Sequence, residues 1–439
     1  MQIKLPFKFK STHISLSYRL FNIVSGIITT LLIAFKFSSS DQGFFYAILA
    51  IIGSNILVEL GFNGILIHYV SHLNNSLKIV KGNIHGNINK IQDLGTFVFK
   101  WSSSASVILF IVYFVLGYIF LLSRYGDDIS LFFWIIICFL NSLIFFFNPF
   151  YIFLEGLSAF KTSFTIKLLQ SFFSNFFYWI LILLDFGLDS IVIYYFVFSI
   201  INILVVVYFK NFIIKIFFSL KNNFTFNWKK DFSRFQIMTA GSTIGGYLSF
   251  TFIIPLILSL SGPVEAGKFG ITFSIMGAYL LMSNGVTSPL VSKFGMLISN
   301  GKYNYIQKLI KKLTYSLIIL GILFIAIVLI FFYFLKLFLP DIMLKFISVN
   351  EVFLLCLAYI VISLSTPFSS FVRAHKYEPF LFLSWLIGLS TIALIYFLFS
   401  NNLSHIFALS YLILQLLTLP FFVGKEYFKC LKSNIIECN

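Results

Sequence analysis

Long apolar runs alternate with short polar and basic segments along the whole chain. The hydrocarbon core of a membrane is about 30 Å thick, so a helix that rises 1.5 Å per residue needs roughly 20 apolar residues to cross it. Twelve runs meet this requirement and are bounded by charged or turn residues, which predicts an all-α polytopic membrane protein. The predicted spans are 17–35, 44–67, 97–121, 131–147, 164–184, 191–209, 235–260, 269–291, 313–335, 352–371, 380–399 and 406–423.

Basic residues divide unevenly between the two sides of these spans. Nearly all of the 31 lysines and arginines fall on the side of the N-terminus. Cytoplasmic segments next to membrane spans carry such an excess of positive charge. The pattern therefore predicts a multi-pass membrane protein with both termini in the cytoplasm. The exceptions are Lys36, Arg124, Lys268, Lys336 and Lys345.

Composition excludes several classes of protein. With 59% hydrophobic and 10% charged residues, the chain is too apolar for an ordinary soluble domain. A net charge of +16 would indicate nucleic acid in a soluble protein, but here the basic residues lie between apolar runs, so no nucleic-acid partner is expected. Cys138, Cys356, Cys430 and Cys438 form no CxxC motif, and neither a disulfide nor a metal site is predicted.

Two internal similarities predict that the chain is built from related halves. A shift of 224 positions aligns the second span with the eighth, and a shift of 218 aligns 148–150 with 366–368. Six spans separate the copies, so both copies cross in the same direction and a pseudo-twofold axis would run along the membrane normal. The alternative is chance similarity between low-complexity helices. The matched glycines are Gly43 with Gly267, Gly53 with Gly277, and Gly61 with Gly285.

The repeat predicts a domain organisation of two six-helix lobes. The N-terminal lobe covers 1–210, a basic cytoplasmic linker covers 211–234, and the C-terminal lobe with its short tail covers 235–439. The outward loops are too short for a folded domain, so the function is expected inside the helical bundle.

Polar residues recur at helical spacing inside several predicted spans. Polar side chains are costly in lipid, so they are expected to face a water-filled cavity between the halves. On the second span, Asn55, Glu59 and Asn63 follow the spacing i, i+4, i+8. The shift of 224 aligns them with Tyr279, Ser283 and Thr287, a polar series in the other half. The cavity candidates are Asn22, Asn55, Glu59, Asn63, Lys167, Gln170, Asn175, Tyr279, Ser283 and Thr287.

Glu59 is the sharpest single candidate among these residues. A carboxylate in a membrane span can hold a proton or a cation, which would couple the protein to a proton or sodium gradient. The alternative is a carboxylate that bonds to a neighbouring helix or reaches toward the cytoplasmic surface. No other cofactor is predicted.

Four cations lie near the cytoplasmic ends of predicted spans. Arg19, Lys167, Lys293 and Arg373 could recognise a diphosphate at the mouth of a cavity. The competing interpretation is that they only set the membrane topology.

Three segments carry a resemblance to a known family. They are GFFYAILAIIGSNILVELGFNGILIHYVSHL, NPFYIFLEGLSAF and TSPLVSKFGMLISNGKYNYIQKLIKK. These resemble Wzx-type O-antigen and polysaccharide flippases of the multidrug/oligosaccharidyl-lipid/polysaccharide exporter superfamily. The resemblance implies alternating access by two lobes that moves undecaprenyl-diphosphate-linked repeat units to the periplasm. It also implies membrane lipid, a polysaccharide polymerase and a chain-length regulator as partners.

Two other functions compete with a flippase. A drug/cation antiporter of the same superfamily would favour a compact acidic cavity, whereas acids are sparse in these spans. A polysaccharide polymerase or glycosyltransferase would need a larger periplasmic loop than the one at Asp127 and Asp128. The chain has no GxxxxGK[ST] motif, so ATP hydrolysis is not expected, and no enzymatic activity is predicted.

Overall fold

The computed structural model describes residues 11–63, 66–67, 70–71, 77–80, 83–86, 88–157, 159–218, 233–299, 301–375 and 377–432. Eleven helices in this part are long and apolar enough to cross a membrane. One of them, Ile237–Thr287, has 51 residues and would extend about 77 Å at 1.5 Å per residue, more than twice the membrane core. The backbone leaves the helical conformation at Gly262, where φ is 85°. This run therefore holds two crossings, and the prediction of twelve spans is confirmed.

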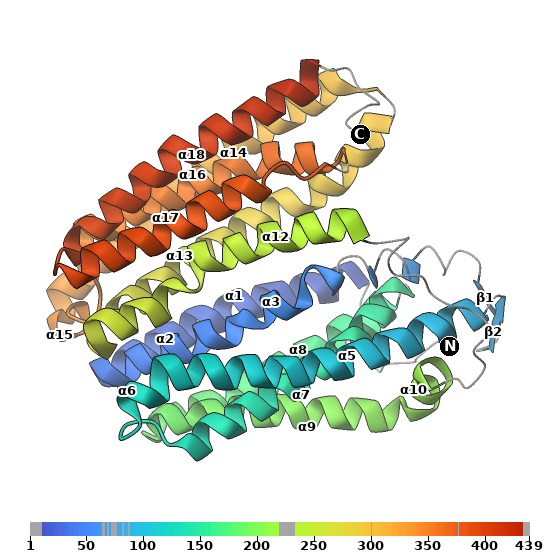
Figure 1. Cartoon of the computed structure of the whole chain (residues 1–439), viewed down its shortest axis with the longest axis horizontal. Helices are drawn as coiled ribbons and strands as arrows, with labels where there is room; N and C mark the ends of the chain where they lie inside the picture. The colour runs from blue at the N-terminus through green and yellow to red at the C-terminus, as the bar shows by residue number, and fades with distance from the viewer. Residues whose placement is uncertain are drawn as a thin grey trace. The chain divides into compact units, whose positions relative to one another are not determined.

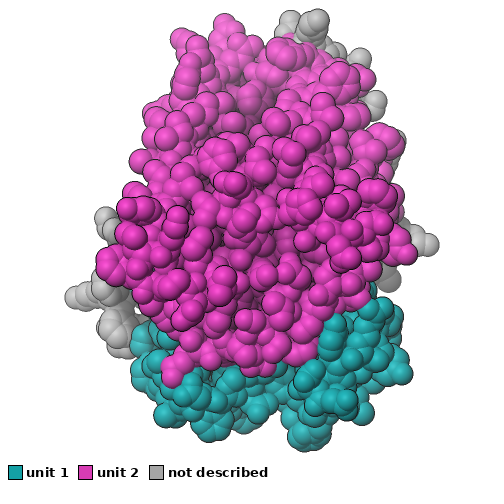
Figure 2. All heavy atoms as spheres, turned by 90° about the vertical axis from the view of Figure 1, so that its left-hand side faces the viewer, with its two compact units in different colours: residues 1–32, 51–236 teal, residues 33–50, 237–439 magenta. Residues whose placement is uncertain are grey.

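The chain divides into two compact units, which Figure 2 draws in different colours. Unit 1 contains residues 1–32 and 51–236, and unit 2 contains residues 33–50 and 237–439. The first helix and the second span thus contribute residues to both units. The lobe boundaries expected from the sequence, 1–210 and 235–439, stay a prediction.

Unit 1 is a bundle of long helices with a small hairpin at one end (Figure 1). β1 and β2 pair antiparallel, with Leu77 opposite Gly86, and are the only strands in the described residues. This hairpin departs from the purely helical prediction. The elements of unit 1 are α1 (Ser11–Lys36, shared with unit 2), η1 (Gly53–Asn55), α3 (Ile56–Glu59), β1 (Leu77–Val80), β2 (Asn83–Gly86), α5 (Ile88–Gly117), η2 (Tyr118–Leu122), α6 (Ser123–Tyr125), α7 (Leu131–Gly156), α8 (Phe160–Leu183), η3 (Gly187–Asp189), α9 (Ser190–Tyr208) and α10 (Lys210–Phe217).

Unit 2 contains the remaining helices and most of α2. Its helix α14 begins at Tyr303, ten residues before the predicted span, so the basic segment around Lys308 is helical rather than a loop. Ser348 and Glu351 form a reciprocal capping box that begins α16. The elements are α2 (Ser39–Ile52), α12 (Ser233–Phe250), α13 (Ile253–Ser299), α14 (Tyr303–Phe338), α15 (Pro340–Met343), α16 (Val349–Arg373), α17 (Leu381–Ser400), η4 (Ser404–Ile406) and α18 (Phe407–Lys432).

The second span is broken near its middle. α2 ends at Ile52, a 3₁₀ turn and the short helix α3 follow, and the backbone then turns left-handed at Leu60 (φ 49°) and Gly61 (φ 72°). Glycine adopts this conformation at little cost, whereas leucine is strained in it. The prediction of one uninterrupted helix over 44–67 is therefore wrong, because a glycine within an apolar run marks a break here.

Aromatic side chains fill the core of unit 1 next to the segment that follows this break. Phe62 stacks on Trp101 of α5 with ring centroids 3.9 Å apart. Phe150 of α7 packs on Phe209, which lies between α9 and α10. Phe153 of α7 packs on Phe217 at the end of α10. This core fixes α5, α7 and α9 relative to one another and so positions the polar side chains that these helices share.

Candidate functional site

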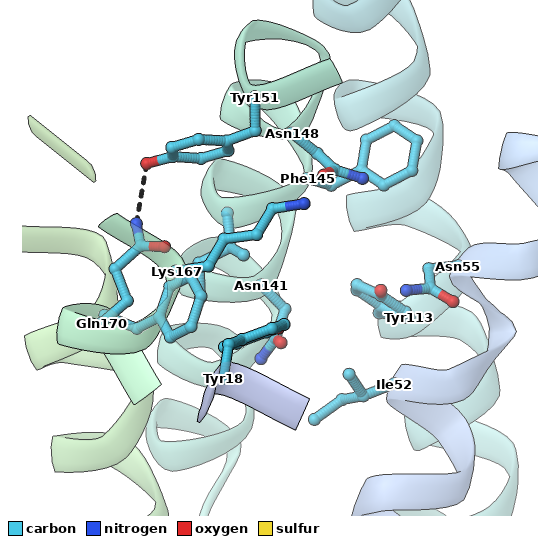
Figure 3. Close-up of a pocket in the computed structure, with 12 residues that line it drawn as sticks. Tyr18, Ile52, Asn55, Tyr113, Asn141, Phe145, Asn148, Tyr151, Lys167 and Gln170 are labelled. Atoms are coloured by element: carbon cyan, nitrogen blue, oxygen red, sulfur yellow. Dashed lines mark hydrogen bonds between the residues drawn. The ribbon is translucent and has the colours of Figure 1, made fainter. Parts of the chain in front are cut away.

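Unit 1 contains a polar pocket with a volume of 270 Å³. Small-molecule sites usually begin near this size. Side chains from six segments of the chain converge on it, as Figure 3 shows for those that are labelled. The lining residues are Tyr18 of α1, Ile52 and Asn55 at the break in the second span, Tyr113 of α5, Asn141, Ile144, Phe145, Asn148 and Tyr151 of α7, Lys167 and Gln170 of α8, and Phe198 of α9.

Helix α7 supplies the largest share of the wall. Asn141, Phe145 and Asn148 lie at i, i+4 and i+7, so their side chains share one face of the helix. Pro149 lies inside this helix, which continues to Gly156 instead of ending at the predicted position 147. The longer helix adds Tyr151 to the same wall and carries Glu155 to the neighbouring helix α8.

Among the described residues that line this pocket, Lys167 is the only one with a formal charge. Its Nζ lies 2.6 Å from Oε1 of Glu155, which also accepts a hydrogen bond of 2.8 Å from Ser163 Oγ. Both charged side chains are mostly buried, with 22% of Lys167 and 12% of Glu155 exposed. An ammonium group has three protons to donate, so contact with one carboxylate oxygen leaves capacity for a ligand.

Three polar side chains form a closed hydrogen-bonded group at one end of the pocket. Gln170 Nε2 donates to Tyr151 Oη and to Asn202 Oδ1, each at 2.7 Å, and Tyr151 Oη donates to the same Asn202 oxygen. Figure 3 draws the contact between Gln170 and Tyr151. All three are buried. Among the described residues, Gln170 Oε1 and Asn202 Nδ2 have no hydrogen-bond partner.

Two predicted cavity residues, Asn22 and Asn175, form hydrogen bonds with Ser171 of α8. Ser171 Oγ donates to Asn22 Oδ1 at 2.7 Å, and Asn175 Nδ2 donates to the carbonyl of Ser171 at the same distance. Trp179 Nε1 donates to Thr29 Oγ1 further along the same pair of helices. Asn22 thus joins α1 to α8, whereas Asn175 bonds within α8.

The predicted polar stripe of the second span is divided by the break. Asn55 lines the pocket, whereas Glu59 accepts hydrogen bonds from the side chain and the backbone of Asn63. Helical residues resume at Phe62, so the Asn63 amide lies in a first turn, where N–H groups lack helical acceptors. The carboxylate of Glu59 supplies an acceptor for this amide, as capping carboxylates do. The prediction that Asn55, Glu59 and Asn63 share one helical face is therefore wrong, because the left-handed residues change the direction of the chain.

The candidates in the second half are buried within unit 2. Tyr279 Oη and Ser363 Oγ lie 2.7 Å apart, which joins α13 to α16. Thr287 Oγ1 donates to the carbonyl of Ser283 in its own helix, and Ser283 Oγ has no partner among the described residues. These contacts stabilise helix packing, and the role of the three residues in a cavity stays a prediction.

The other predicted cations have different surroundings. Arg19 is exposed on α1, and the side chain of Lys293 lies outside the described part. Arg373 contacts Glu378 through Nε at 2.7 Å and a terminal nitrogen at 3.1 Å. Glu378 is buried and also accepts a hydrogen bond from Ser242. Of the four predicted diphosphate-binding cations, Lys167 lines the pocket.

Sequence reasoning missed several residues of the pocket. Asn141 and Tyr151 of the lining, and Asn202 that bonds to Tyr151, were not among the candidates, although an amide within the apolar segment of α7 or α9 is a signal that can be read from sequence. Their partnership could not be read, because Tyr151 and Asn202 lie 51 positions apart.

The described residues contain no group of three histidine, cysteine, aspartate or glutamate side chains that could hold a metal. Cys138 and Cys356 are free and buried, Cys430 is buried, and Cys438 lies outside the described residues. The pocket therefore offers amides, phenols, aromatic rings and one ammonium group to a ligand.

Comparison by sequence finds no match, either to a protein-family model or to a curated protein. Several solved structures are similar over nearly the whole chain. The lipid II flippase MurJ in an inward closed conformation is 15% identical over 97% of this chain and 90% of that chain, with a TM-score of 0.63. A MATE transporter in complex with MaL6 is 12% identical over 95% of this chain and 94% of that chain, with a TM-score of 0.54.

A MOP superfamily transporter from Pyrococcus furiosus is 14% identical over 97% of this chain and 94% of that chain, with a TM-score of 0.50. At such identities, the similarity establishes the architecture and leaves the substrate open. The chain therefore has the fold of the MOP superfamily transporters.

Proposed function

We propose that this protein moves an oligosaccharide linked to undecaprenyl diphosphate from the cytoplasmic to the periplasmic leaflet, for the assembly of O-antigen or a related surface polysaccharide. The observation that carries the proposal is the lining of the pocket in unit 1. Its polar groups are the amides of Asn55, Asn141, Asn148 and Gln170, three phenols, and the ammonium group of Lys167.

This lining suits a polar head group with many hydroxyls. Amides both donate and accept hydrogen bonds, as sugar hydroxyls do. The rings of Phe145, Phe198 and the tyrosines provide flat apolar surfaces between these groups. Lys167 would attract the negative charge of a diphosphate, as an ammonium group does elsewhere.

The same lining disfavours a drug/cation antiporter. A carboxylate would stabilise a bound lipophilic cation, and none is among the described residues that line this pocket. Glu155 lies next to it, but this carboxylate already contacts Lys167 and Ser163. The similarity to MATE transporters extends to the fold and does not supply the missing charge.

The mechanism proposed is alternating access. The polar head group enters a wet site while the isoprenoid tail stays in lipid, and two conformations open that site to opposite sides of the membrane. Glu59 is proposed to couple this exchange to a proton or sodium gradient. A polysaccharide polymerase and a chain-length regulator are proposed as partners in the inner membrane, with both termini of this chain in the cytoplasm.

A flipping assay with purified protein tests the proposal. Vesicles that contain a fluorescent undecaprenyl-diphosphate oligosaccharide report flipping by the loss of fluorescence to an impermeant quencher. Wild-type protein should accelerate flipping, Asn148→Ala should reduce the rate several-fold, and Asn401→Ala, which removes an exposed amide of a loop, should not. Wild-type vesicles that export lipophilic cations but do not flip the lipid would overturn the proposal.

A further inference from the structure

A second depression lies in unit 1 between α8 and α9, and its lining is almost wholly apolar. Its volume is 300 Å³. Among the described residues that line it, only Thr162 and Tyr208 have a polar side-chain atom. Leu204 and Tyr208 at its rim are exposed by 61% and 71%, so the depression opens on the outer surface of the helical bundle. The groove is lined by Thr162 and Ile166 of α8, by Ile201, Leu204, Val205 and Tyr208 of α9, and by Phe209, which directly follows α9.

This α8–α9 groove and the polar pocket lie along the same two helices. On α8, Thr162 and Ile166 line the groove, and Gln170, at the next step of four residues, lines the pocket. Val205 of α9 and Phe209, which directly follows α9, line the groove, whereas Phe198 of α9 lines the pocket. Residues at these spacings share one side of a helix. The two sites are therefore neighbours along one continuous seam.

The hydrogen-bonded group of Tyr151, Gln170 and Asn202 lies at the boundary between the polar pocket and the apolar groove. Asn202 lies between Phe198 and Val205 on α9, and Gln170 follows Ile166 by one turn on α8. The change from amides to aliphatic side chains thus occurs within about one helical turn. An amphiphile has the same abrupt boundary, between its charged head and its hydrocarbon tail.

We infer that the α8–α9 groove holds the first part of the isoprenoid tail of the transported lipid while its diphosphate and sugars occupy the polar pocket. This inference rests on the proposed function and adds a separate site for the tail. The groove lies at the start of α8 and the end of α9, the ends predicted to face the cytoplasm. A lipid-linked oligosaccharide in the cytoplasmic leaflet would meet the groove there.

The groove would select the tail by shape. Lipid chains are as apolar as leucine, so no hydrophobic gain accompanies transfer from the bilayer into the groove. Van der Waals packing of a branched chain against Val205 and Phe209 supplies the preference. Binding of the tail also raises the effective concentration of the attached head group at the pocket. The groove should therefore strengthen binding of the intact lipid and leave binding of a tail-free head group unchanged.

Substitution at the rim of the groove tests the inference. Leu204→Trp would fill the opening with a large side chain, and Leu204 is exposed enough for the fold to accept it. Val207→Trp on the same helix is the matched control, because Val207 is 60% exposed and does not line the groove. Both purified full-length variants would be compared in nanodiscs for binding of the lipid-linked oligosaccharide and of the corresponding soluble diphospho-oligosaccharide.

Leu204→Trp should weaken binding of the lipid-linked form about tenfold and leave binding of the soluble form unchanged, whereas Val207→Trp should alter neither. A diazirine on the isoprenoid tail should label α8 or α9 peptides in wild-type protein, and excess phospholipid should not compete. Equal binding by both variants, or labelling displaced by phospholipid, would overturn the tail site. If wild-type protein neither binds nor flips the lipid, the proposed function fails instead.

Discussion

Gly43 and Gly267 contact each other in unit 2, and they are equivalent positions of the internal repeat. A Cβ atom added to Gly267 would lie 3.0 Å from the backbone nitrogen of Gly43. The next equivalent pair, Tyr46 and Gly270, is also in contact, because a Cβ on Gly270 would lie 2.4 Å from that of Tyr46. A residue contacts its own equivalent only near a twofold axis. The contact between α2 and α13 thus supports the repeat detected at a shift of 224 positions.

The first prediction concerns this close approach. A Cβ on Gly43 would lie 1.8 Å from the carbonyl oxygen of Pro263, which is backbone and cannot rotate away. We expect Gly43→Ala to lower the free energy of unfolding by about 2 kcal/mol, as overpacked sites do. Gly277→Ala is the control, because nothing lies within 4 Å of its added Cβ. Thermal unfolding in detergent measures both, and equal melting temperatures would contradict the contact.

The second prediction concerns Lys345, which lies in the loop before α16. Its Nζ donates to the carbonyls of Ala34 and Phe37 at 2.8 and 2.6 Å, at the end of α1. Burial lowers the pKa of Lys345 below its ordinary value of 10.5. The folded protein therefore binds fewer protons than the unfolded chain just below pH 10.5, so this group makes stability rise with pH in that window.

Melting temperatures of wild-type protein and Lys345→Met, measured from neutral pH to pH 10.5, isolate this contribution. We expect the difference, wild type minus variant, to increase with pH and to level off above the ordinary pKa. A difference that is constant with pH would show that the ammonium group has the same pKa in both states.

The third prediction concerns the group of Tyr151, Gln170 and Asn202. Tyr151→Phe removes one donor and leaves the contact between Gln170 and Asn202, so we expect a loss of about 1 kcal/mol. Asn202→Leu removes the shared acceptor of both neighbours and should cost more. A double-mutant cycle, measured by unfolding in detergent, should give a coupling energy above about 0.5 kcal/mol. Additive effects would indicate that the three side chains do not act together.

The fourth prediction separates structure from transport at Glu155 and Lys167. Lys167→Met leaves a mostly buried carboxylate with Ser163 alone, so it should lower both stability and flipping. The exchange Glu155→Lys with Lys167→Glu restores the ion pair but puts an anion beside the pocket. We therefore expect near wild-type melting with flipping reduced at least tenfold. Full flipping by the exchanged protein would show that Lys167 serves only to pair with Glu155.

The fold was predictable from sequence to a greater extent than the site. Membrane spans depend on length and apolarity, which are local properties, so all twelve were found. The ends were less accurate, because α7 continues past Pro149, beyond its predicted end at 147, and α14 begins in the basic segment before its predicted start at 313. The pocket combines side chains from Tyr18 to Phe198, and their contacts follow from packing of helices far apart in the chain. Lys167, Gln170 and Asn55 were found because each is polar within an apolar run.

The last prediction concerns Glu59, whose two roles can be separated by substitution. As a capping group it accepts hydrogen bonds from Asn63, next to the left-handed residues Leu60 and Gly61. The amide oxygen of Glu59→Gln can still accept these bonds, whereas Glu59→Ala cannot. We expect Glu59→Ala to lose about 1 kcal/mol of stability, as caps do when truncated, and Glu59→Gln to lose much less. If the charge also couples transport, Glu59→Gln should flip the lipid at a rate that no longer responds to an imposed proton or sodium gradient. A gradient response equal to that of wild-type protein would leave Glu59 with the capping role alone, because Glu59→Gln removes the charge of this side chain.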